Sequence, residues 1–547
     1  MARLDRLASV RLVAQIGASI GREFSYALLR AVSRLPEAEL QSALTRLVAA
    51  ELVFQRGAPP DAVYTFKHAL VQDAAHSSLL RSSRQQLHAQ IASALETHFP
   101  ELMDSQPELL AQHYAEAGLV EKSVAYWSQA GRRSAARSAM AEAAAQFQKG
   151  LDQLALLPNN RERQQQELEF WSALGAALRF VKGLAALETG QAYARARALW
   201  EQLGCPSEFL YVPYGQSRYH AARGDLNLAR RVEQNLLRLS RERKDSAGLV
   251  LGHLSSGRTS WYVGKLSLSR SHLEEVLALY DPISNRSIVD QTTIYPQVAA
   301  QAYLGTVLLC LGFPDQALAQ ESAAVAEARR LAHPPSIAVS LACGARVLSI
   351  VEDNAALSEW VAQLVSVTAE QGFSHWGAQG PIYRGWLDVQ NGEVAKGISL
   401  LHSGLAAFRA TGAETFTPHF IALLAKAYDI DGQIEEGLTL LDDALQIAAQ
   451  TGECWFAAEL NRHKGQLLLR RGNSEAAEEL YGKALSIAEE QGAKLWELRA
   501  VASLARLRRD QGHNEARSLL APVYDWFTEG LDTQDLKDAK ALLDELG

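Results

Sequence analysis

The amino-acid sequence predicts an all-α protein, a solenoid of paired antiparallel helices with a 40-residue period, preceded by a small N-terminal domain. Three observations support this prediction. The chain has 547 residues, and a single hydrophobic core stops growing at ~250–300 residues, so several domains or a repeat array are required. Only 16 prolines occur, which allows long helices. Glycines recur at a fixed spacing over much of the chain.

Two interleaved series of glycines define the repeat. The first series has a 40-residue spacing, with one 48-residue step from Gly264 to Gly312, and runs through Gly224, Gly264, Gly312, Glu352, Gly392, Gly432, Gly472 and Gly512. The eight additional residues fit within residues 281–296. The second series lies half a period away and comprises Gly372, Gly412, Gly452 and Gly492. Two turns in each period describe stacked helix pairs, with ~14–16 residues in each helix.

Small residues occupy a fixed column between these turns. Seven residues before successive turns of the first series stand Gly257, Gly305, Ala345, Gly385, Ala425, Gly465 and Ala505. Helix backbones approach closely only where side chains are short. This pattern resembles the tetratricopeptide repeat, stretched from its usual ~34 residues, and the resemblance implies a right-handed superhelix of helical hairpins. We expect the repeats over residues 110–547, with an undefined register at 151–210.

The N-terminal residues follow another pattern. Helical periodicity covers residues 3–14, 24–33 and 37–50, and short alternating segments at 52–55 and 63–66 flank a Gly/Pro-rich turn. Three helices followed by a β-hairpin are typical of a winged-helix domain. We therefore predict a winged-helix domain at 1–67, linker helices at 68–109 and the solenoid at 110–547.

Composition narrows the class of protein further. The net charge of −8 argues against general coating of nucleic acid. Four cysteines lie far apart without a C-x-x-C motif, which indicates reduced thiols. The N-terminus lacks the apolar segment of a signal peptide, and we expect no membrane-spanning segment. These features predict a cytoplasmic protein.

Motifs for catalysis are few. The string Gly17–Gly21 matches G-x-S-x-G, but helical segments surround it, so we interpret it as a tight turn between helices rather than a nucleophile elbow. Neither a Walker A sequence nor an H-E-x-x-H motif occurs. We therefore predict that the chain is not an enzyme and uses no cofactor and no metal ion.

Several longer segments resemble one family. They are residues 1–7 (MARLDRL), 16–24 (IGASIGREF), 64–75 (YTFKHALVQDAA), 519–530 (LLAPVYDWFTEG) and 535–543 (DLKDAKALL). Together they resemble the C-terminal half of bacterial class III adenylate/guanylate cyclase proteins that carry a STAND-type ATPase and a tetratricopeptide tail. The resemblance implies the order cyclase, ATPase, winged helix and repeats. Because this sequence lacks the P-loop and the cyclase carboxylates, neither activity is carried over.

The resemblance implies a role for one residue. His68 stands where STAND ATPases place a histidine that contacts the β-phosphate of the bound nucleotide in the inactive state. Lys67 and Ala69 depart from the methionine and aspartate of that motif. His68 is therefore expected to sense the nucleotide state only when an ATPase domain is present, and the alternative is a histidine that caps a strand-to-helix junction.

The tetratricopeptide pattern also implies a concave groove, lined by the first helix of each pair. Ten positions are expected to face it: Arg346, Trp386, His419, Lys426, Glu459, Arg462, Gln466, Arg499, Arg506 and Arg509. Six are basic and one is acidic, so the groove favours an acidic peptide or protein surface, because guanidinium groups bind carboxylates through paired hydrogen bonds. The alternative is a solvated helical face.

Three functions remain open from the sequence. The first is a non-catalytic regulatory and protein-binding module of a bacterial signalling ATPase or nucleotide cyclase system, with an upstream cyclase or ATPase domain as a further partner. The second is a fragment of a STAND/LuxR-type transcriptional regulator, although the predicted third helix carries Arg46 against Glu37 and Glu39, too little positive charge for DNA. The third is an adenylate cyclase by family that lacks the catalytic domain.

Overall fold

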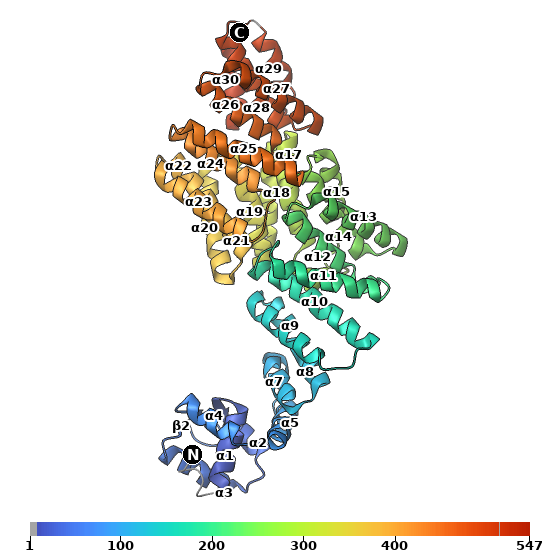
Figure 1. The fold of residues 1–547 in the computed structure, drawn as a ribbon, viewed down its shortest axis with the longest axis vertical. Coiled ribbons are helices and arrows are strands. Elements are labelled where there is room, and N and C mark those ends of the chain that lie inside the picture. Colours follow the sequence, from blue (N-terminus) through green and yellow to red (C-terminus); the bar gives the residue numbers. More distant parts are fainter. Residues whose placement is uncertain (1–7, 514, 547) are drawn as a thin grey trace. The chain divides into compact units, whose positions relative to one another are not determined.

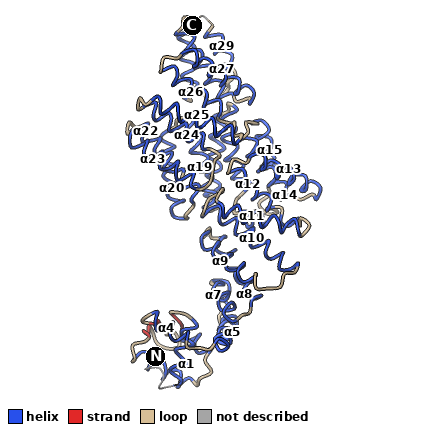
Figure 2. Tube along the Cα trace, viewed as in Figure 1, coloured by secondary structure: helices blue, strands red, loops and turns tan. Residues whose placement is uncertain are grey.

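The computed structural model describes residues 8–513 and 515–546. The chain forms two compact units: one comprises Met1–Ser134 and Ala145–Phe170, and the other comprises Ala135–Ala144 and Trp171–Gly547. Most of the described residues are helical, and the few strands among them lie near the N-terminus (Figures 1 and 2). The prediction of an all-α repeat protein is confirmed.

The first unit opens with helices and a small sheet. Its elements are α1 (Ala8–Ile20), β1 (Glu23–Ser25), α2 (Tyr26–Val32), α3 (Glu37–Ala49), β2 (Val53–Arg56) and β3 (Val63–Phe66). The strands form an antiparallel sheet in the order β1-β3-β2. The helix predicted to begin at residue 24 begins at Tyr26, because Ser25 Oγ accepts a hydrogen bond from the Leu28 amide and caps the helix.

Two expectations for the start of the chain are corrected. The helix predicted at 3–14 continues to Ile20, while residues 3–7 lie outside the described part. The Gly17–Gly21 string is therefore mostly helical rather than a turn between helices. A Cβ atom on Gly17 would lie 2.7 Å from the Phe24 ring, so this glycine allows an aromatic side chain to pack against the helix.

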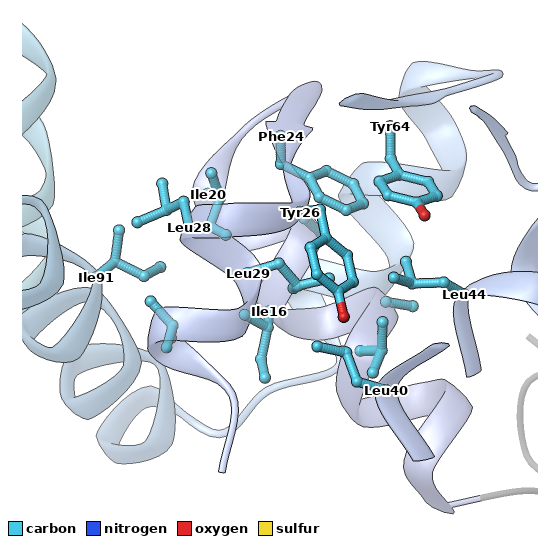
Figure 3. Close-up of a cluster of buried hydrophobic side chains, with 14 of the residues drawn as sticks. Ile16, Ile20, Phe24, Tyr26, Leu28, Leu29, Leu40, Leu44, Tyr64 and Ile91 are labelled. Carbon is cyan, nitrogen blue, oxygen red and sulfur yellow. The ribbon is translucent and has the colours of Figure 1, made fainter. Parts of the chain in front are cut away.

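One hydrophobic core connects the beginning of the first unit to the helices that follow. Phe24, Tyr26 and Tyr64 pack together, and Ile91 joins them from α5 (Figure 3). The later helices are α4 (Ala69–Ser77), α5 (Arg81–His98), α6 (Pro100–Ser105), α7 (Pro107–Ala117) and α8 (Val120–Ala136). The segment expected to be a linker therefore shares its core with residues 8–67, and the compact units end at residues other than the expected domain boundaries.

Successive helix pairs make up the rest of the chain (Figure 1). Their bounds begin with α9 (Met140–Leu154), α10 (Arg161–Val181), α11 (Leu187–Gln202), η1 (Ser207–Phe209), α12 (Tyr211–Ala222), α13 (Leu226–Arg243), α14 (Ser246–Tyr262), α15 (Leu266–Leu279), α16 (Arg286–Thr292), α17 (Pro296–Leu311) and α18 (Pro314–Arg330). They continue with α19 (Pro334–Val351), α20 (Asn354–Gln371), α21 (Ser374–Gly377), α22 (Gln379–Gln390), α23 (Val394–Ala410), α24 (Thr417–Ile430), α25 (Ile434–Thr451), α26 (Ala457–Arg470), α27 (Ser474–Gln491), α28 (Lys494–Asp510), α29 (Ala516–Tyr524) and α30 (Gln534–Glu545).

The predicted turn positions are confirmed. The glycines of both series have positive φ, including 86° at Gly392 and 80° at Gly432. Glu352 occupies the one position of the first series where glycine is missing, and it still adopts φ 61° at the end of α19. Most of the eight additional residues are accounted for by α16, a helix of seven residues between α15 and α17.

Small residues allow the two helices of a pair to cross closely. A Cβ atom on Gly385 in α22 would lie 2.7 Å from the carbonyl oxygen of Gly397 in α23, and one on Gly465 in α26 would lie 2.8 Å from the Tyr481 ring in α27. Both glycines belong to crossings where a larger side chain would displace backbone or a buried ring. The small-residue column therefore sets the distance between paired helices.

The helix α19 is long and apolar enough to span a membrane by length and composition, with a mean hydropathy of 1.5, and the bent pair α16–α17 passes the same test. This differs from the expectation that no such segment exists. In α19, however, 83% of the residues are buried inside the protein, and Arg346 lies among them. The helix is therefore accounted for as the core helix of the solenoid.

The superhelix turns back onto itself. The carbonyl oxygen of Tyr262 accepts hydrogen bonds from the amides of Cys454 (2.7 Å) and Trp455 (3.2 Å), and that of Ala222 accepts one from the Glu414 amide (2.9 Å). Ala222 also accepts a bond from Thr415, which lies 193 residues further along the chain, and the Ser374 hydroxyl donates to Val181 across the same separation. Between four and five repeats therefore complete one superhelical turn, and the next turn rests on it.

Glycines in the first superhelical turn permit this contact. A Cβ atom on Gly224 would lie 2.4 Å from Cγ2 of Thr451, and one on Gly264 would lie 2.6 Å from the Gln491 amide group. The equivalent glycines of the second turn, Gly432 and Gly472, have no atom within 4 Å of that position. The glycines of this series therefore form loops in both superhelical turns, and those of the first turn also pack against the second turn.

This difference predicts unequal effects of the same substitution. Gly224 and Gly432 have φ values of 81° and 80°, so alanine introduces comparable backbone strain at both. Gly224→Ala should also overpack the contact with Thr451 and reduce the free energy of unfolding by ~1–3 kcal/mol more than Gly432→Ala. Urea denaturation of both variants measures the difference, and equal losses would contradict the contact between turns.

Candidate partner-binding site

The ten residues predicted to face the groove lie on α19, α22, α24, α26 and α28, the first helices of five successive pairs. We refer to the side of the solenoid on which they lie as the inner face. Five of the ten are buried, four are partly buried and one is exposed. Among the cationic residues, only Arg509 is classed as exposed, and it pairs with Asp510 and Glu545. Most of the ten residues divide into a buried aromatic group, Arg346, Trp386 and His419, and a charged pocket.

Arg346, Trp386 and His419 are almost completely buried, with exposed fractions of 1–2%. The guanidinium group of Arg346 lies 3.8 Å from the centre of the Phe416 ring and 5.4 Å from that of Trp261. His419 packs against aromatic rings of α24 and of the segment before α26. These three residues stabilise the interior instead of presenting a surface.

An aromatic seam joins the two superhelical turns at this level. Trp261 of α14 lies 5.3 Å from the rings of both Phe416 and Trp455, measured between ring centres. The Phe416 amide donates to both carboxylate oxygens of Glu453 (3.0 Å each), which holds Phe416 at φ 71°. Burial raises the pKa of Glu453 to about 7. The sequence analysis missed this seam, although Phe416 and Trp455 stand 39 residues apart, close to the repeat period.

Glu459 organises the charged residues of the inner face. Its carboxylate is fully buried and accepts hydrogen bonds from Nε of Arg462 (2.6 Å), Nη2 of Arg462 (3.0 Å) and Nη1 of Arg499 (3.0 Å). Burial acts to raise the pKa of Glu459, but Arg462 and Arg499 hold it well below its ordinary value. Glu459 is therefore charged, and it neutralises the cations around it.

Arg499 connects this network to two distant parts of the chain. It forms paired hydrogen bonds with Asp535 of α30 (2.7 and 2.8 Å) and donates to the carbonyl oxygen of Ile350 at the end of α19 (2.7 Å). Its side chain is only 10% exposed. The C-terminal helix and the preceding superhelical turn are thus fixed to α28 through one guanidinium group.

A pocket of about 230 Å³ opens beside this network. It is lined by Lys426, Arg462, Gln466, Arg499, Ser503 and Arg506 together with Val351, Glu352, Leu498, Ala502, Gln534, Asp535 and Asp538. Five of the ten predicted groove residues therefore meet at one site. Within residues 8–513 and 515–546, neither Lys426 nor Arg506 forms an ion pair with a carboxylate.

The electrostatics of the pocket make Lys426 distinctive. Burial lowers the pKa of its ammonium group to about 8, and Arg499 lowers it further, whereas Glu459 acts in the opposite direction. The ammonium group lies 5.7 Å from the centre of the Trp386 ring. An anionic ligand would stabilise the charged form of Lys426, because it would supply interactions in place of those with water that burial has removed.

His68, predicted to sense a nucleotide, lies exposed between β3 and α4 in an extended conformation with φ −134° and ψ 137°. Its side chain does not cap α4. Neighbouring Lys67 pairs with Glu51 at 3.0 Å. The histidine is accessible to a ligand, and its sensing role remains a prediction.

The first unit contains a histidine chain that the sequence analysis did not find. Nε2 of His76 lies 3.3 Å from Nε2 of His88, and Nδ1 of His88 lies 2.9 Å from Nδ1 of His113. Burial lowers the pKa of His88 to about 4 and that of His113 to about 3, so both are neutral at pH 7. In the described part of the chain, no group of three or more His, Cys, Asp or Glu residues is arranged to hold a metal ion.

The helix pairs and their periodic turns place the chain among tetratricopeptide-like helical-repeat solenoids. No known family model matches the sequence. An uncharacterized protein of Rhizobium meliloti (strain 1021) is 25% identical over 512 residues, which cover 92% of this chain and 49% of that protein. The chain thus spans about half the length of the curated relative it matches.

Solved structures with a similar helical fold have low sequence identity to this chain. A Rap protein complexed with competence and sporulation factor is 13% identical to this chain. The match covers 68% of this chain and 98% of the Rap chain, with a TM-score of 0.49. The apo quorum sensor NprR from B. thuringiensis is 14% identical (67% and 99% covered, TM-score 0.39). A STAND protein with a tetratricopeptide repeat sensor from Pyrococcus horikoshii is 11% identical (99% and 65% covered, TM-score 0.30).

The buried network predicts a change in stability. Arg462→Glu would place a second carboxylate against Glu459 and should therefore destabilise the fold. Glu459→Gln should reduce the free energy of unfolding by ~3–5 kcal/mol, since it leaves the buried Arg462 without a counter-charge and Arg499 with Asp535 alone.

A matched control is Glu545→Gln, which breaks the exposed pair with Arg509 and should leave stability nearly unchanged. Chemical denaturation followed by circular dichroism measures both variants. A Glu459→Gln variant as stable as the control would show that the network does not hold the inner face together.

Proposed function

We propose that this chain is a non-catalytic regulatory module that binds a protein or peptide segment on the inner face of its solenoid. One observation carries the proposal. Four cationic side chains from α24, α26 and α28 meet in one pocket, while Glu459 and Asp535 pair with only two of them, Arg462 and Arg499. Lys426 and Arg506 remain available for a partner with acidic groups.

The arrangement in repeats favours an extended partner. The first helices of three consecutive pairs contribute Lys426, Arg462 and Arg506, so a segment laid across them contacts several repeats at once. Gln466 and Ser503 line the same pocket and can exchange hydrogen bonds with a peptide backbone. An acidic peptide therefore fits this face better than an apolar or a basic one.

The proposed setting is a bacterial signalling ATPase or nucleotide cyclase system in the cytoplasm. The order of α1, β1, α2, α3, β2 and β3, with its antiparallel sheet, supports a winged helix at residues 1–67. The resemblance in sequence adds an upstream cyclase or ATPase domain as a partner, with the exposed His68 as its nucleotide-state sensor. A protein partner is favoured over DNA, because α3 carries Glu37 and Glu39 in its first turn and only Arg46 in its last turn.

Peptide binding tests this proposal directly. The full chain should bind labelled peptides rich in Asp and Glu in fluorescence anisotropy, and should bind Asn/Gln versions of the same peptides far more weakly. Affinity should fall as salt is raised from about 50 to about 300 mM, because screening weakens contacts between partly exposed charges. Equal binding of the acidic and amide peptides, or binding that does not depend on salt, would contradict the proposal.

A further inference from the structure

We infer that the pocket receives one carboxylate group of the partner between Lys426 and Arg506; this inference rests on the function proposed above. Lys426 comes from α24 and Arg506 from α28, and both line the same cavity of about 230 Å³. They belong to helices that are two pairs apart in the solenoid. A group held by both would therefore bridge the first and the third of three consecutive repeats.

The other two cations of the pocket are already engaged. Arg462 uses Nε and Nη2 to bind Glu459. Arg499 binds Glu459, Asp535 and the Ile350 carbonyl through four hydrogen bonds, and a guanidinium group has five N–H donors. Arg462 and Arg499 keep unused N–H groups, but their charges are already paired with carboxylates, so Lys426 and Arg506 are the cations of the pocket whose charge remains for a ligand.

The size of the pocket limits what can enter. Its volume lies below the ~300–1,000 Å³ of pockets for drug-sized ligands, so it accommodates a side chain or a chain end rather than a folded surface. Leu498 and Ala502 provide an apolar wall, and Gln466 and Ser503 provide neutral polar groups. These dimensions and this chemistry suit the carboxylate of an acidic residue or of a peptide C-terminus.

The acidic residues of the pocket select the charge of the ligand. Glu352, Asp535 and Asp538 line it together with the four cations, and Glu459 lies behind Arg462. With Glu459 included, four carboxylates balance the four cations, so a group with a single negative charge is favoured over a phosphate dianion, which the carboxylates would repel. The structure therefore assigns a carboxylate rather than a phosphate group.

The protonation of Lys426 gives a direct readout of occupancy. Its pKa of about 8 reflects burial, with Arg499 and Arg462 lowering it and Glu459 and Glu352 raising it; Arg506, Asp535 and Asp538 share its pocket. A bound carboxylate favours the charged ammonium form and raises the pKa of Lys426. Binding should consequently weaken as the pH rises above 8, where the free protein loses this charge.

The experiment follows Lys426 by NMR in the full chain after reductive ¹³C-methylation of its lysines, with Lys426→Arg used to assign the signal. Two carboxylates are titrated at constant ionic strength: N-acetyl-glycine, which offers a chain end, and N-acetyl-glutamate methylamide, which offers a side chain. At least one should raise the pKa of Lys426, and the tighter of the two identifies the source. Arg506→Gln should weaken that binding about tenfold.

Arg384→Gln is the matched control, because Arg384 lies exposed on α22 outside the pocket, and it should leave the titration unchanged. The inference is overturned if neither carboxylate shifts the Lys426 signal, if inorganic phosphate binds more tightly than both, or if Arg384→Gln weakens binding as much as Arg506→Gln. Acidic peptides that bind without affecting Lys426 would refute this site and leave the proposed function standing. If the small carboxylates raise the pKa of Lys426 but none of the acidic peptides binds, the site is supported and the peptide-binding function is refuted.

Discussion

The contact between successive superhelical turns is the constraint on which the inner face depends. Backbone groups of the first turn, at Val181, Ala222 and Tyr262, accept hydrogen bonds from residues about 193 positions later. This repeated separation fixes the pitch of the superhelix, so some side chains of the inner helices meet a second layer of protein. Arg346 and His419 are buried for this reason, and Arg499 reaches the end of α19.

Burial within a closed superhelix determines how charges can be arranged. A cation placed there needs a counter-charge, an aromatic face or a ligand. Arg346 uses the Phe416 ring, whereas Arg462 and Arg499 share the carboxylate of Glu459. Among the described residues, neither Lys426 nor Arg506 forms an ion pair with a carboxylate. Lys426 has one aromatic contact, at 5.7 Å from the centre of the Trp386 ring. Lys426 and Arg506 therefore differ from the neighbouring arginines, whose charges are balanced by a carboxylate or lie against an aromatic ring.

The sequence predicts the features that repeat and misses those that depend on the superhelical pitch. The 40-residue glycine register located the turns, even at Glu352, because a helix that ends in a left-handed residue leaves a periodic trace. The pairing of Glu459 with Arg462 could have been found, since three residues separate them on one helix. The contacts of Arg346 and Arg499 could not, because the pitch depends on many small helix-packing angles. The strand β1 was missed because a three-residue strand carries almost no periodic signal.

The most direct measurement of the closed superhelix is amide hydrogen exchange at Cys454 and Trp455. These amides lie between α25 and α26, outside both helices, and their hydrogen bonds go to Tyr262 of the other superhelical turn. If the turns are in contact, both amides should exchange as slowly as amides inside the adjacent helices. Exchange as fast as that of the exposed loop at Gly472 would show that the turns separate in solution, and would contradict this account of the inner face.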